Sequence, residues 1–397
     1  MTASAALRVL AITKIFPNAL EPLSAPFNRQ QFAALATRCH VEVMATIPWF
    51  PGAGALGRWS SAGKLANVPR RERIGEIEVS HPRTLFVPRL AHATWGPLYA
   101  ASIAPSVLAR RGDFDVVLGS WAYPDGFAAV IAAELLGVPA VVKLHGSDIN
   151  AIAQLPGPRA MLRWALPRAA RVVAVSRPLA DAAIELGVEP ERIAVVRNGV
   201  DGELFHVRDR APARARLGLP AGPLALYVGN LKPEKGVLEL AAAWTIVARA
   251  RPDATLVLVG AGPLAAAIER ELAPIGDRVR MVGAVPLAAV PDYLAAADLL
   301  VLPSHMEGTP NVVLEAHASG RRVVATRIGG VPDLVTDALL GELVPPRDPA
   351  ALATALIAAL ATPYDPAQVA ARSASSGWAA SAAALHDVLA SATVERR

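Results

Sequence analysis

Apolar residues follow one another in short runs rich in Val, Ile and Leu, and segments with helical spacing lie between these runs. In the first half of the chain the runs are LRVLAIT (7–13), HVEVMAT (40–46), FDVVLGS (114–120), AVVKLHG (140–146), RVVAVS (171–176) and RIAVVRN (192–198). In the second half they are LALYVGN (224–230), TLVLVG (255–260), VRMVGAV (279–285), LLVLPS (299–304) and RRVVATR (321–327). Phe127–Leu136, Pro178–Leu186 and Val237–Ala248 place apolar residues on one helical face. Uninterrupted apolar strands that alternate with helices predict parallel sheets covered on both faces.

This pattern starts again after one polar segment, DGELFHVRDRAPARARLGLPAGP (201–223), which is rich in charge, Pro and Gly. We therefore predict an α/β chain of two Rossmann-like, doubly wound parallel-sheet domains, at 1–205 and 206–376, that face a central cleft. The Ala-rich tail from about Asp348 is expected to contain two helices. The last, within about 377–397, can pack on either domain, including back on the first.

Composition and charge narrow the class of protein. The 397 residues are 53% hydrophobic, enough for large cores, and the formal net charge of +5 is modest for this length. That charge is compatible with anionic substrates or an anionic membrane surface and does not indicate nucleic-acid binding. The single cysteine, Cys39, excludes an intramolecular disulfide and a Cys-rich zinc site. The start MTASAALRVLAIT lacks a signal-peptide pattern and no uncharged apolar run is long enough to span a bilayer, so we expect a cytoplasmic protein.

The stretch EGTPNVVLE (307–315) places two glutamates around a Gly-Thr-Pro turn. Thr309 suits an N-cap and Pro310 the first helical position, which predicts a helix over about Pro310–Ser319. Helix-start amides attract anions, and carboxylates accept hydrogen bonds from hydroxyl groups. A nucleotide diphosphate sugar carries both features. The alternative is a capped helix with two solvated glutamates.

Two further strand ends carry candidate chemistry. LHGSDIN (144–150) follows an apolar strand, so its His145 is expected at the carboxyl edge of a parallel sheet, where ligands bind. YVGNLKPEKG (227–236) closes the first strand of the second half, where Gly229 permits close backbone approach and Lys232 and Lys235 can neutralise a phosphate. The alternatives are a histidine with local hydrogen bonds and a solvated turn with surface lysines.

Two apparent motifs are rejected. GAGALG (52–57) matches the dinucleotide fingerprint, but PWFP separates it from the preceding strand and a poor helix follows, so we predict a flexible loop. DFD (113–115) resembles a metal site, but no second carboxylate or histidine cluster accompanies it, and a hard cation needs several oxygen ligands. No metal and no cofactor are therefore expected.

Three segments in this order resemble the retaining glycosyltransferases of family 4, which have the GT-B fold. They are VVAVSRPLADAAIELGVEPERIAVVRNGVD, VGNLKPEKGV and YLAAADLLVLPSHMEGTPNVVLEAHASGRRVVATRIGGVPDLV. The resemblance covers nearly the whole chain and is most specific from Ala170 to Pro346.

The resemblance also implies residue roles. Glu315 matches the glutamate that binds the ribose of the donor nucleotide, and Glu307 matches the one that contacts the donor sugar. Lys235 matches the lysine on the leaving phosphate, and His145 matches the histidine that approaches the donor sugar from the first domain. The loop that cradles sugar and diphosphate corresponds to Gly308, Thr309, Pro310, Asn311 and Val312. His145, Lys235 and Glu307 are thus the predicted catalytic residues.

The phosphate-binding turn departs from the family at one position. Gly229 is followed by Asn230 where the family often has arginine, so one cation is missing, and Lys232 or Arg197 could supply it. The acceptor loop KIFPNALEPLSAPFNRQQF after the first strand also lacks the usual Gly pair, so the resemblance does not identify the acceptor.

The resemblance implies a retaining, metal-independent transferase. It would move a hexose from a UDP- or GDP-sugar to a glycan or lipid-linked acceptor in cell-surface polysaccharide or glycolipid synthesis. A non-catalytic nucleotide-sugar-binding module and a sugar-nucleotide epimerase are the alternatives. Residues 48–73 combine Trp49, Phe50 and Trp59 with several Arg and Lys residues. This composition suits an anionic membrane surface, so contact with the inner face of the cell membrane is the further expectation, against an ordinary solvated loop.

Overall fold

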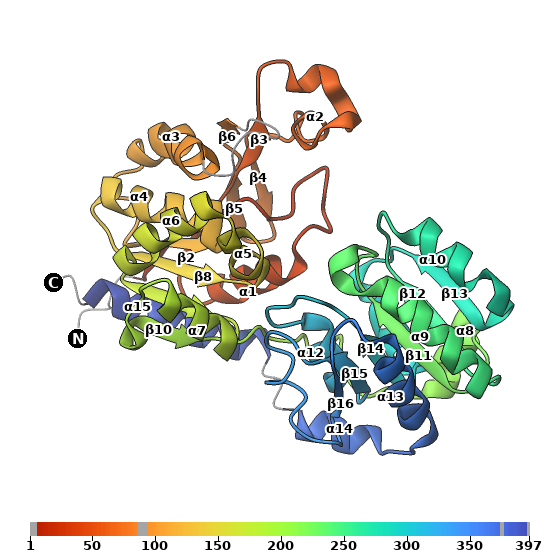
Figure 1. The fold of residues 1–397 in the computed structure, drawn as a ribbon. Helices are drawn as coiled ribbons and strands as arrows, with labels where there is room; N and C mark the ends of the chain where they lie inside the picture. The colour runs from red at the N-terminus through yellow and green to blue at the C-terminus, as the bar shows by residue number, and fades with distance from the viewer. Residues whose placement is uncertain (1–5, 86–93, 374–376, 395–397) are drawn as a thin grey trace. The chain divides into compact units, whose positions relative to one another are not determined.

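A computed structural model describes residues 6–85, 94–373 and 377–394 (Figure 1). The chain forms two compact units: unit 1 contains Met1–Asn198 and Trp378–Arg397, and unit 2 contains Gly199–Gly377. The backbone therefore leaves unit 1 after Asn198 and re-enters it at Trp378.

Unit 1 is built on an eight-stranded sheet with the order β10-β9-β8-β7-β1-β2-β5-β4. The strands are β1 (Arg8–Thr13), β2 (His40–Ala45), β4 (Arg71–Ile74), β5 (Ile77–Ser80), β7 (Val116–Ser120), β8 (Ala140–Leu144), β9 (Arg171–Ala174) and β10 (Ile193–Val195). All neighbours are parallel except β4 and β5, which form an antiparallel hairpin at one edge. The carboxyl ends of β1, β7 and β8 therefore lie together at one edge of the sheet.

Helices cover both faces of this sheet, as its continuous apolar strands require. The α-helices of unit 1 are α1 (Pro26–Ala36), α2 (Ser61–Lys64), α3 (Trp95–Leu108), α4 (Phe127–Leu136), α5 (Ser147–Asn150), α6 (Pro156–Ala165), α7 (Arg177–Glu185) and α15 (Trp378–Val394), of which α2 lies beside β3 and not on this sheet. On one face, Val9, Val43 and Val141 pack with Phe32 of α1 and Leu385 of α15. The other face carries α3, α4, α6 and α7 (Figure 1). The C-terminal helix is thus part of the core of unit 1.

Unit 2 has a six-stranded, all-parallel sheet with the order β13-β12-β11-β14-β15-β16. Its strands are β11 (Leu224–Val228), β12 (Thr255–Val259), β13 (Val279–Gly283), β14 (Leu299–Leu302), β15 (Arg322–Thr326) and β16 (Gly341–Val344). Its helices are α8 (Arg210–Leu217), α9 (Val237–Ala250), α10 (Ala265–Leu272), α11 (Val290–Ala296), α12 (Asn311–Ala318), α13 (Pro349–Ala361) and α14 (Pro366–Arg372). Helices α9, α10 and α13 pack on one face, and α11 and α12 on the other. The predicted fold class of two parallel α/β sheets is confirmed.

Two local predictions were wrong, that of a loop at GAGALG and that of two helices in the tail. The GAGALG segment is not a plain loop: Ala53–Trp59 forms 3-10 turns that lead into α2. The strand before it, β3 (Ile47–Trp49), pairs with β6 (Arg83–Leu85) in a separate two-stranded sheet, so the context of a dinucleotide fingerprint is missing. The tail from Asp348 forms three helices, α13, α14 and α15, because Pro366 begins a short helix of its own that Asp365 caps. Within the described ranges, no helix has the length and apolar character needed to cross a bilayer.

Candidate functional site

The two predicted catalytic residues of unit 2 contact each other directly. Lys235 Nζ lies 2.6 Å from Glu307 Oε1, and Ser304 Oγ donates to the same oxygen at 2.7 Å. The side chains of Lys235 and Glu307 are 27% and 10% exposed, so the pair remains accessible at the surface of unit 2. Sequence reasoning missed Ser304, although its position at the carboxyl end of β14 is where ligand-binding side chains collect.

Close backbone contacts hold this pair in place. The turn with Lys235 ends at Gly236, which has φ +63°, and a Cβ at this position would lie 1.9 Å from the carbonyl oxygen of Pro303. His305 N donates to Glu234 O at 2.9 Å, which joins the two loops. Only glycine fits this conformation and this approach together, so the sequence PEKG serves the packing of the two loops.

A second glycine pair supports the loop from the other side. Gly329 has φ +47°, and a Cβ there would lie 2.0 Å from Glu307 O. Gly330 N donates to Gly308 O at 2.8 Å. The IGG sequence after β15 therefore fixes the backbone of Glu307 and Gly308, a role that sequence analysis did not assign.

The helix after this loop begins one residue later than expected. Helix α12 starts at Asn311, and Pro310 is the cap residue with extended backbone (φ −72°, ψ 112°) and no side-chain cap hydrogen bond. Thr309 therefore precedes the cap and is not the N-cap residue, because the extended ψ of Pro310 delays the first helical residue. Thr309 and Pro310 are buried, and Asn311 and Val312 are partly buried. The helix still begins only four residues after Glu307.

Glu315 lies inside α12 and its side chain is partly buried. Burial raises the pKa of its carboxyl group to about 7. Within the part of the chain that the structure describes, no hydrogen bond or ion pair reaches this carboxylate. A partly buried carboxylate without a partner carries a cost that a hydrogen-bonding ligand would offset.

The turn after β11 packs closely against the end of β12 through its backbone. Gly229 N donates to Val259 O at 3.0 Å, and a Cβ on Gly260 would lie 1.8 Å from Gly229 O. The side chains of Asn230 and Lys232 are exposed. Arg197, the other proposed source of a cation, is exposed on unit 1.

His145 lies in unit 1, directly after β8, and is partly buried. Its Nε2 is 3.0 Å from Ser120 Oγ, and its ring stacks on Trp121 with centroids 5.4 Å apart. Phe27 contacts the ring with a centroid distance of 5.3 Å. Burial, with a smaller contribution from the charge of Lys143, moves the pKa of His145 well below its usual value. His145 is therefore a neutral imidazole.

The loop with His145 is anchored by Asp148. This buried carboxylate accepts hydrogen bonds from Ala122 N at 2.7 Å, Gly146 N at 2.7 Å and His145 N at 3.1 Å. Burial raises the pKa of Asp148 and these N–H groups oppose that shift. Asp148 thus orders the backbone of the loop.

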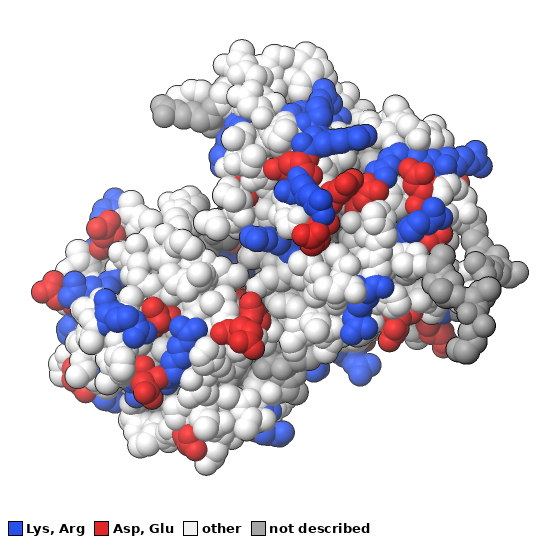
Figure 2. Space-filling view, turned by 180° about the vertical axis from the view of Figure 1, so that it is seen from behind, with Lys and Arg blue, Asp and Glu red and all other residues white. Residues whose placement is uncertain are grey.

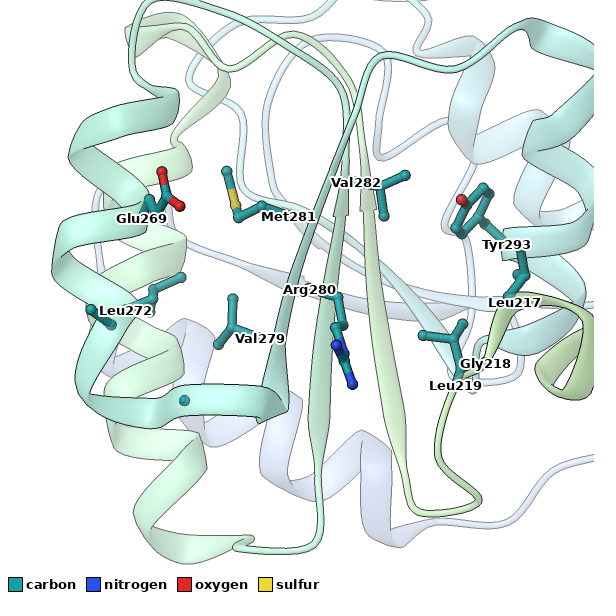
Figure 3. Close-up of a pocket in the computed structure, with 12 residues that line it drawn as sticks. Leu217, Gly218, Leu219, Glu269, Leu272, Val279, Arg280, Met281, Val282 and Tyr293 are labelled. Carbon is teal, nitrogen blue, oxygen red and sulfur yellow. The ribbon is translucent and has the colours of Figure 1, made fainter.

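In the rejected DFD segment, both carboxylates form ion pairs with arginines. Asp115 pairs with Arg8 at 2.7 Å, and Asp113 pairs with Arg110 at 3.3 Å. Among the described residues, no group of three or more His, Cys, Asp or Glu could hold a metal ion. A cavity of about 520 Å³ lies along the edge strand β13, between Met281 and Leu272 on one side and Tyr293 and Leu217 on the other (Figure 3). None of the predicted site residues lines it.

Comparison with known proteins agrees with this arrangement. Residues 34–204 match the model of Glycosyltransferase Family 4, and residues 222–362 match that of Glycosyl transferases group 1. A teichuronic acid biosynthesis glycosyltransferase of Bacillus subtilis is 31% identical over 359 residues, which cover 88% of each chain. The D-inositol 3-phosphate glycosyltransferase of Streptomyces scabiei is 34% identical over 317 residues, 72% of this chain and 70% of the relative.

The fold has close neighbours among solved structures. HepE of Anabaena, solved with UDP, has a TM-score of 0.72 at 21% identity, with 97% of this chain and 100% of HepE covered. HepE has also been solved with UDP-glucose (TM-score 0.62, 21% identity, 92% of this chain and 98% of HepE). At this identity the likeness shows the fold alone. Taken together, the sequence matches and the two parallel sheets show that this chain belongs to the family 4 glycosyltransferases and has the GT-B fold.

Proposed function

We propose that the protein transfers a hexose from a UDP-sugar, with retention of anomeric configuration, to a glycan or lipid-linked acceptor of the cell surface. The relatives named for teichuronic acid synthesis and for D-inositol 3-phosphate, and the HepE complexes with UDP and UDP-glucose, support this choice. A GDP-sugar is the competing donor.

The observation that carries the proposal is the cluster in unit 2. Lys235 and Glu307 form a 2.6 Å ion pair at the surface, and the start of α12 follows Glu307 by four residues. Glu315, whose carboxylate has no hydrogen-bond partner among the described residues, lies in the same helix. One cation, helix-start amides and two carboxylates are the groups that a nucleoside diphosphate sugar needs for its phosphates and its hydroxyls.

The proposed chemistry is departure of a nucleoside diphosphate from the anomeric carbon. The transition state resembles an oxocarbenium ion, and negative charge grows on the leaving phosphate. Lys235 would bind that phosphate and Glu307 would then accept hydrogen bonds from the sugar. The helix-start amides would add positive potential, so this route requires no divalent metal. The acceptor attacks on the same face, and its proton passes to the leaving phosphate.

For the acceptor, we propose contact with an anionic membrane surface through residues 48–73. Trp59 is 84% exposed and Trp49 is 43% exposed, and the register partner of Trp49 on β6, Leu85, is 37% exposed. Arg70 and Arg71 nearby in sequence are exposed, while Lys64 pairs with Glu21. On the face in Figure 2, basic and acidic side chains are interspersed, so the exposed tryptophans, not a single-sign patch, carry this proposal.

Co-sedimentation with phosphatidylcholine vesicles, with and without phosphatidylserine, tests the membrane contact. We expect binding that rises with phosphatidylserine and falls in Trp59→Ser. Trp164→Ser is the matched control, since Trp164 is 36% exposed on α6, away from this segment. Binding that ignores lipid charge, or equal loss in both variants, would remove the membrane from the proposal.

Thermal unfolding with UDP, GDP, ADP and their sugars, without added metal, tests the donor. A ligand at about 100 times its Kd adds about 2.7 kcal/mol, which is roughly 5–10 °C for a unit of this size. We expect the shift with UDP and UDP-hexoses. A shift with GDP alone would mean that the donor is a GDP-sugar. Strict dependence of nucleotide binding on added Mg²⁺ would refute the metal-free route. Product analysis by NMR would then report the anomeric configuration.

A further inference from the structure

A chain of hydrogen bonds runs from the backbone of unit 1 to the ring of His145. Asn28 Nδ2 donates to Ile15 O at 2.9 Å, and Ser120 Oγ donates to Asn28 Oδ1 at 3.1 Å. The third link is the 3.0 Å contact between Ser120 Oγ and His145 Nε2. Asn28 and Ser120 are fully buried, so water does not compete for these bonds.

The donors and acceptors in this series of hydrogen bonds determine the tautomer of His145. The backbone carbonyl of Ile15 can only accept, so it orients the amide of Asn28 with Oδ1 toward Ser120. Ser120 has one hydroxyl proton, and Asn28 takes it. Ser120 Oγ can then only accept from His145, which requires the proton on Nε2. In a neutral ring the lone pair is therefore on Nδ1.

The ring has little freedom to change this arrangement. Trp121 stacks on it with an interplanar angle of 21°, and Phe27 contacts it at a 46° tilt. Trp121 itself has φ +124°, a conformation that is rare outside glycine and that costs on the order of 1–3 kcal/mol. Such a strained residue at a sheet edge persists where its side chain has a task. Within the described ranges, Nδ1 has no hydrogen-bond partner.

We infer that Asn28 and Ser120 are positioning residues that hold His145 as the neutral Nε2–H tautomer, so that Nδ1 accepts a hydrogen bond from a hydroxyl of the donor sugar. The tautomer follows from the hydrogen bonds of unit 1 alone, and the hydroxyl partner rests on the proposed function. An imidazole acceptor orients the sugar without adding charge beside the developing oxocarbenium ion.

Long-range proton–nitrogen NMR of the free, histidine-labelled protein tests the tautomer. The chain has 8 histidines, and His145→Gln identifies the signal of His145. We expect a protonated Nε2 and an unprotonated Nδ1, which have well-separated nitrogen shifts. A protonated Nδ1, or an averaged pair of signals, would overturn the inference.

Two variants test the positioning residues. In Asn28→Ala the hydroxyl of Ser120 loses its acceptor and can donate to Nε2, so the population should move toward the Nδ1–H tautomer. Ser120→Ala removes the fixed partner, and averaged signals are expected. Ser176→Ala is the control, because Ser176 is a buried serine of unit 1 whose hydroxyl has no hydrogen-bond partner among the described residues. Unchanged signals in both test variants would overturn the positioning role.

Titration with UDP and with UDP-glucose tests the proposed hydrogen bond between a hydroxyl of the donor sugar and Nδ1 of His145. The Nδ1 signal should move with UDP-glucose and stay with UDP, and both variants should lose about fivefold in kcat/KM for transfer. If UDP alone moved the Nδ1 signal by the same amount, the proposed contact between His145 and the donor sugar would be wrong. Failure of every nucleotide sugar to bind would count against the proposed function, whereas the tautomer of the free protein is read independently.

Discussion

Glu315 combines a stability cost with a proposed binding role. Its pKa is raised from 4.5 to about 7 by burial, so the folded protein binds a proton more tightly than the unfolded chain. The stability of the free protein should therefore fall as pH rises through this window, and the cost is fully present above about pH 7. We predict that Glu315→Gln raises the free energy of unfolding by about 1–3 kcal/mol at about pH 8 and by little at about pH 4.5. Urea unfolding at both pH values measures this.

The same substitution should weaken UDP binding at least about fivefold, because a neutral amide is a poorer acceptor for ribose hydroxyls than a carboxylate. Glu342→Gln is the matched control, since Glu342 is an exposed glutamate in β16 of the same unit. Gain in stability without loss of UDP binding would place the ribose elsewhere.

Lys235 is the cation closest to the predicted sugar-binding carboxylate, at 2.6 Å. We predict that Lys235→Ala lowers kcat at least about tenfold, or about 1.4 kcal/mol, because negative charge on the leaving phosphate then lacks its cation. Lys232→Ala, an exposed lysine of the same turn, should stay within about twofold. Steady-state kinetics with saturating donor separates the two, and equal effects would mean that general positive potential, not Lys235, assists departure.

At the residue level, sequence could identify the side chains that lie in a recognisable motif. Lys235, Glu307 and Glu315 were predicted this way, and the structure joins the first two. Ser304, Asn28 and Ser120 were missed because each makes its hydrogen bond to a partner that the fold supplies. Asn28 and Ser120 are 92 positions apart in sequence and meet only when α1 packs beside the end of β7.

Among the structural elements, the turn between β11 and α9 can be tested by two glycines with the same backbone. Gly236 has φ +63° and no room for a side chain, whereas Gly218 has φ +60° and nothing within 4 Å of a Cβ. We predict that Gly236→Ala costs about 2–4 kcal/mol, from backbone strain and overlap with Pro303 O, and greatly reduces donor binding. Gly218→Ala should cost only about 1 kcal/mol of strain and leave donor binding intact.

Denaturant unfolding and UDP binding of the two variants provide the comparison. If Gly236→Ala and Gly218→Ala lowered the free energy of unfolding equally, the close contact between the two loops would not be needed for stability.

Long elements were predictable because periodicity persists over many residues: Phe127–Leu136 was predicted as a helix and is α4. Short elements such as β3, β6 and α2 were missed, since three or four residues carry too little pattern.

In the whole molecule, alternation of strands and helices predicts two parallel sheets, but it does not give the order of their strands. The order in unit 1 places β7 beside β1 across more than 100 residues of sequence, as in the pairing of Val9 with Val116. The alternation of strands and helices also does not show which domain the last helix packs on, because an apolar face can pack on any complementary surface. The structure buries Leu385 and Leu389 of α15 in the core of unit 1 with Phe32.

This assignment of α15 gives a prediction for the unfolding of the molecule. Leu385 is fully buried in unit 1 and Leu356 is fully buried in unit 2, so either change to alanine should cost about 2–5 kcal/mol. In calorimetry with UDP, we expect the nucleotide to raise the transition of unit 2. Leu385→Ala should then lower the other transition by several degrees, and Leu356→Ala should lower the nucleotide-sensitive one. If Leu385→Ala lowered the nucleotide-sensitive transition instead, α15 would stabilise the nucleotide-binding unit. The C-terminal helix would then couple the two units in unfolding, because its loss would reach a core that it does not enter.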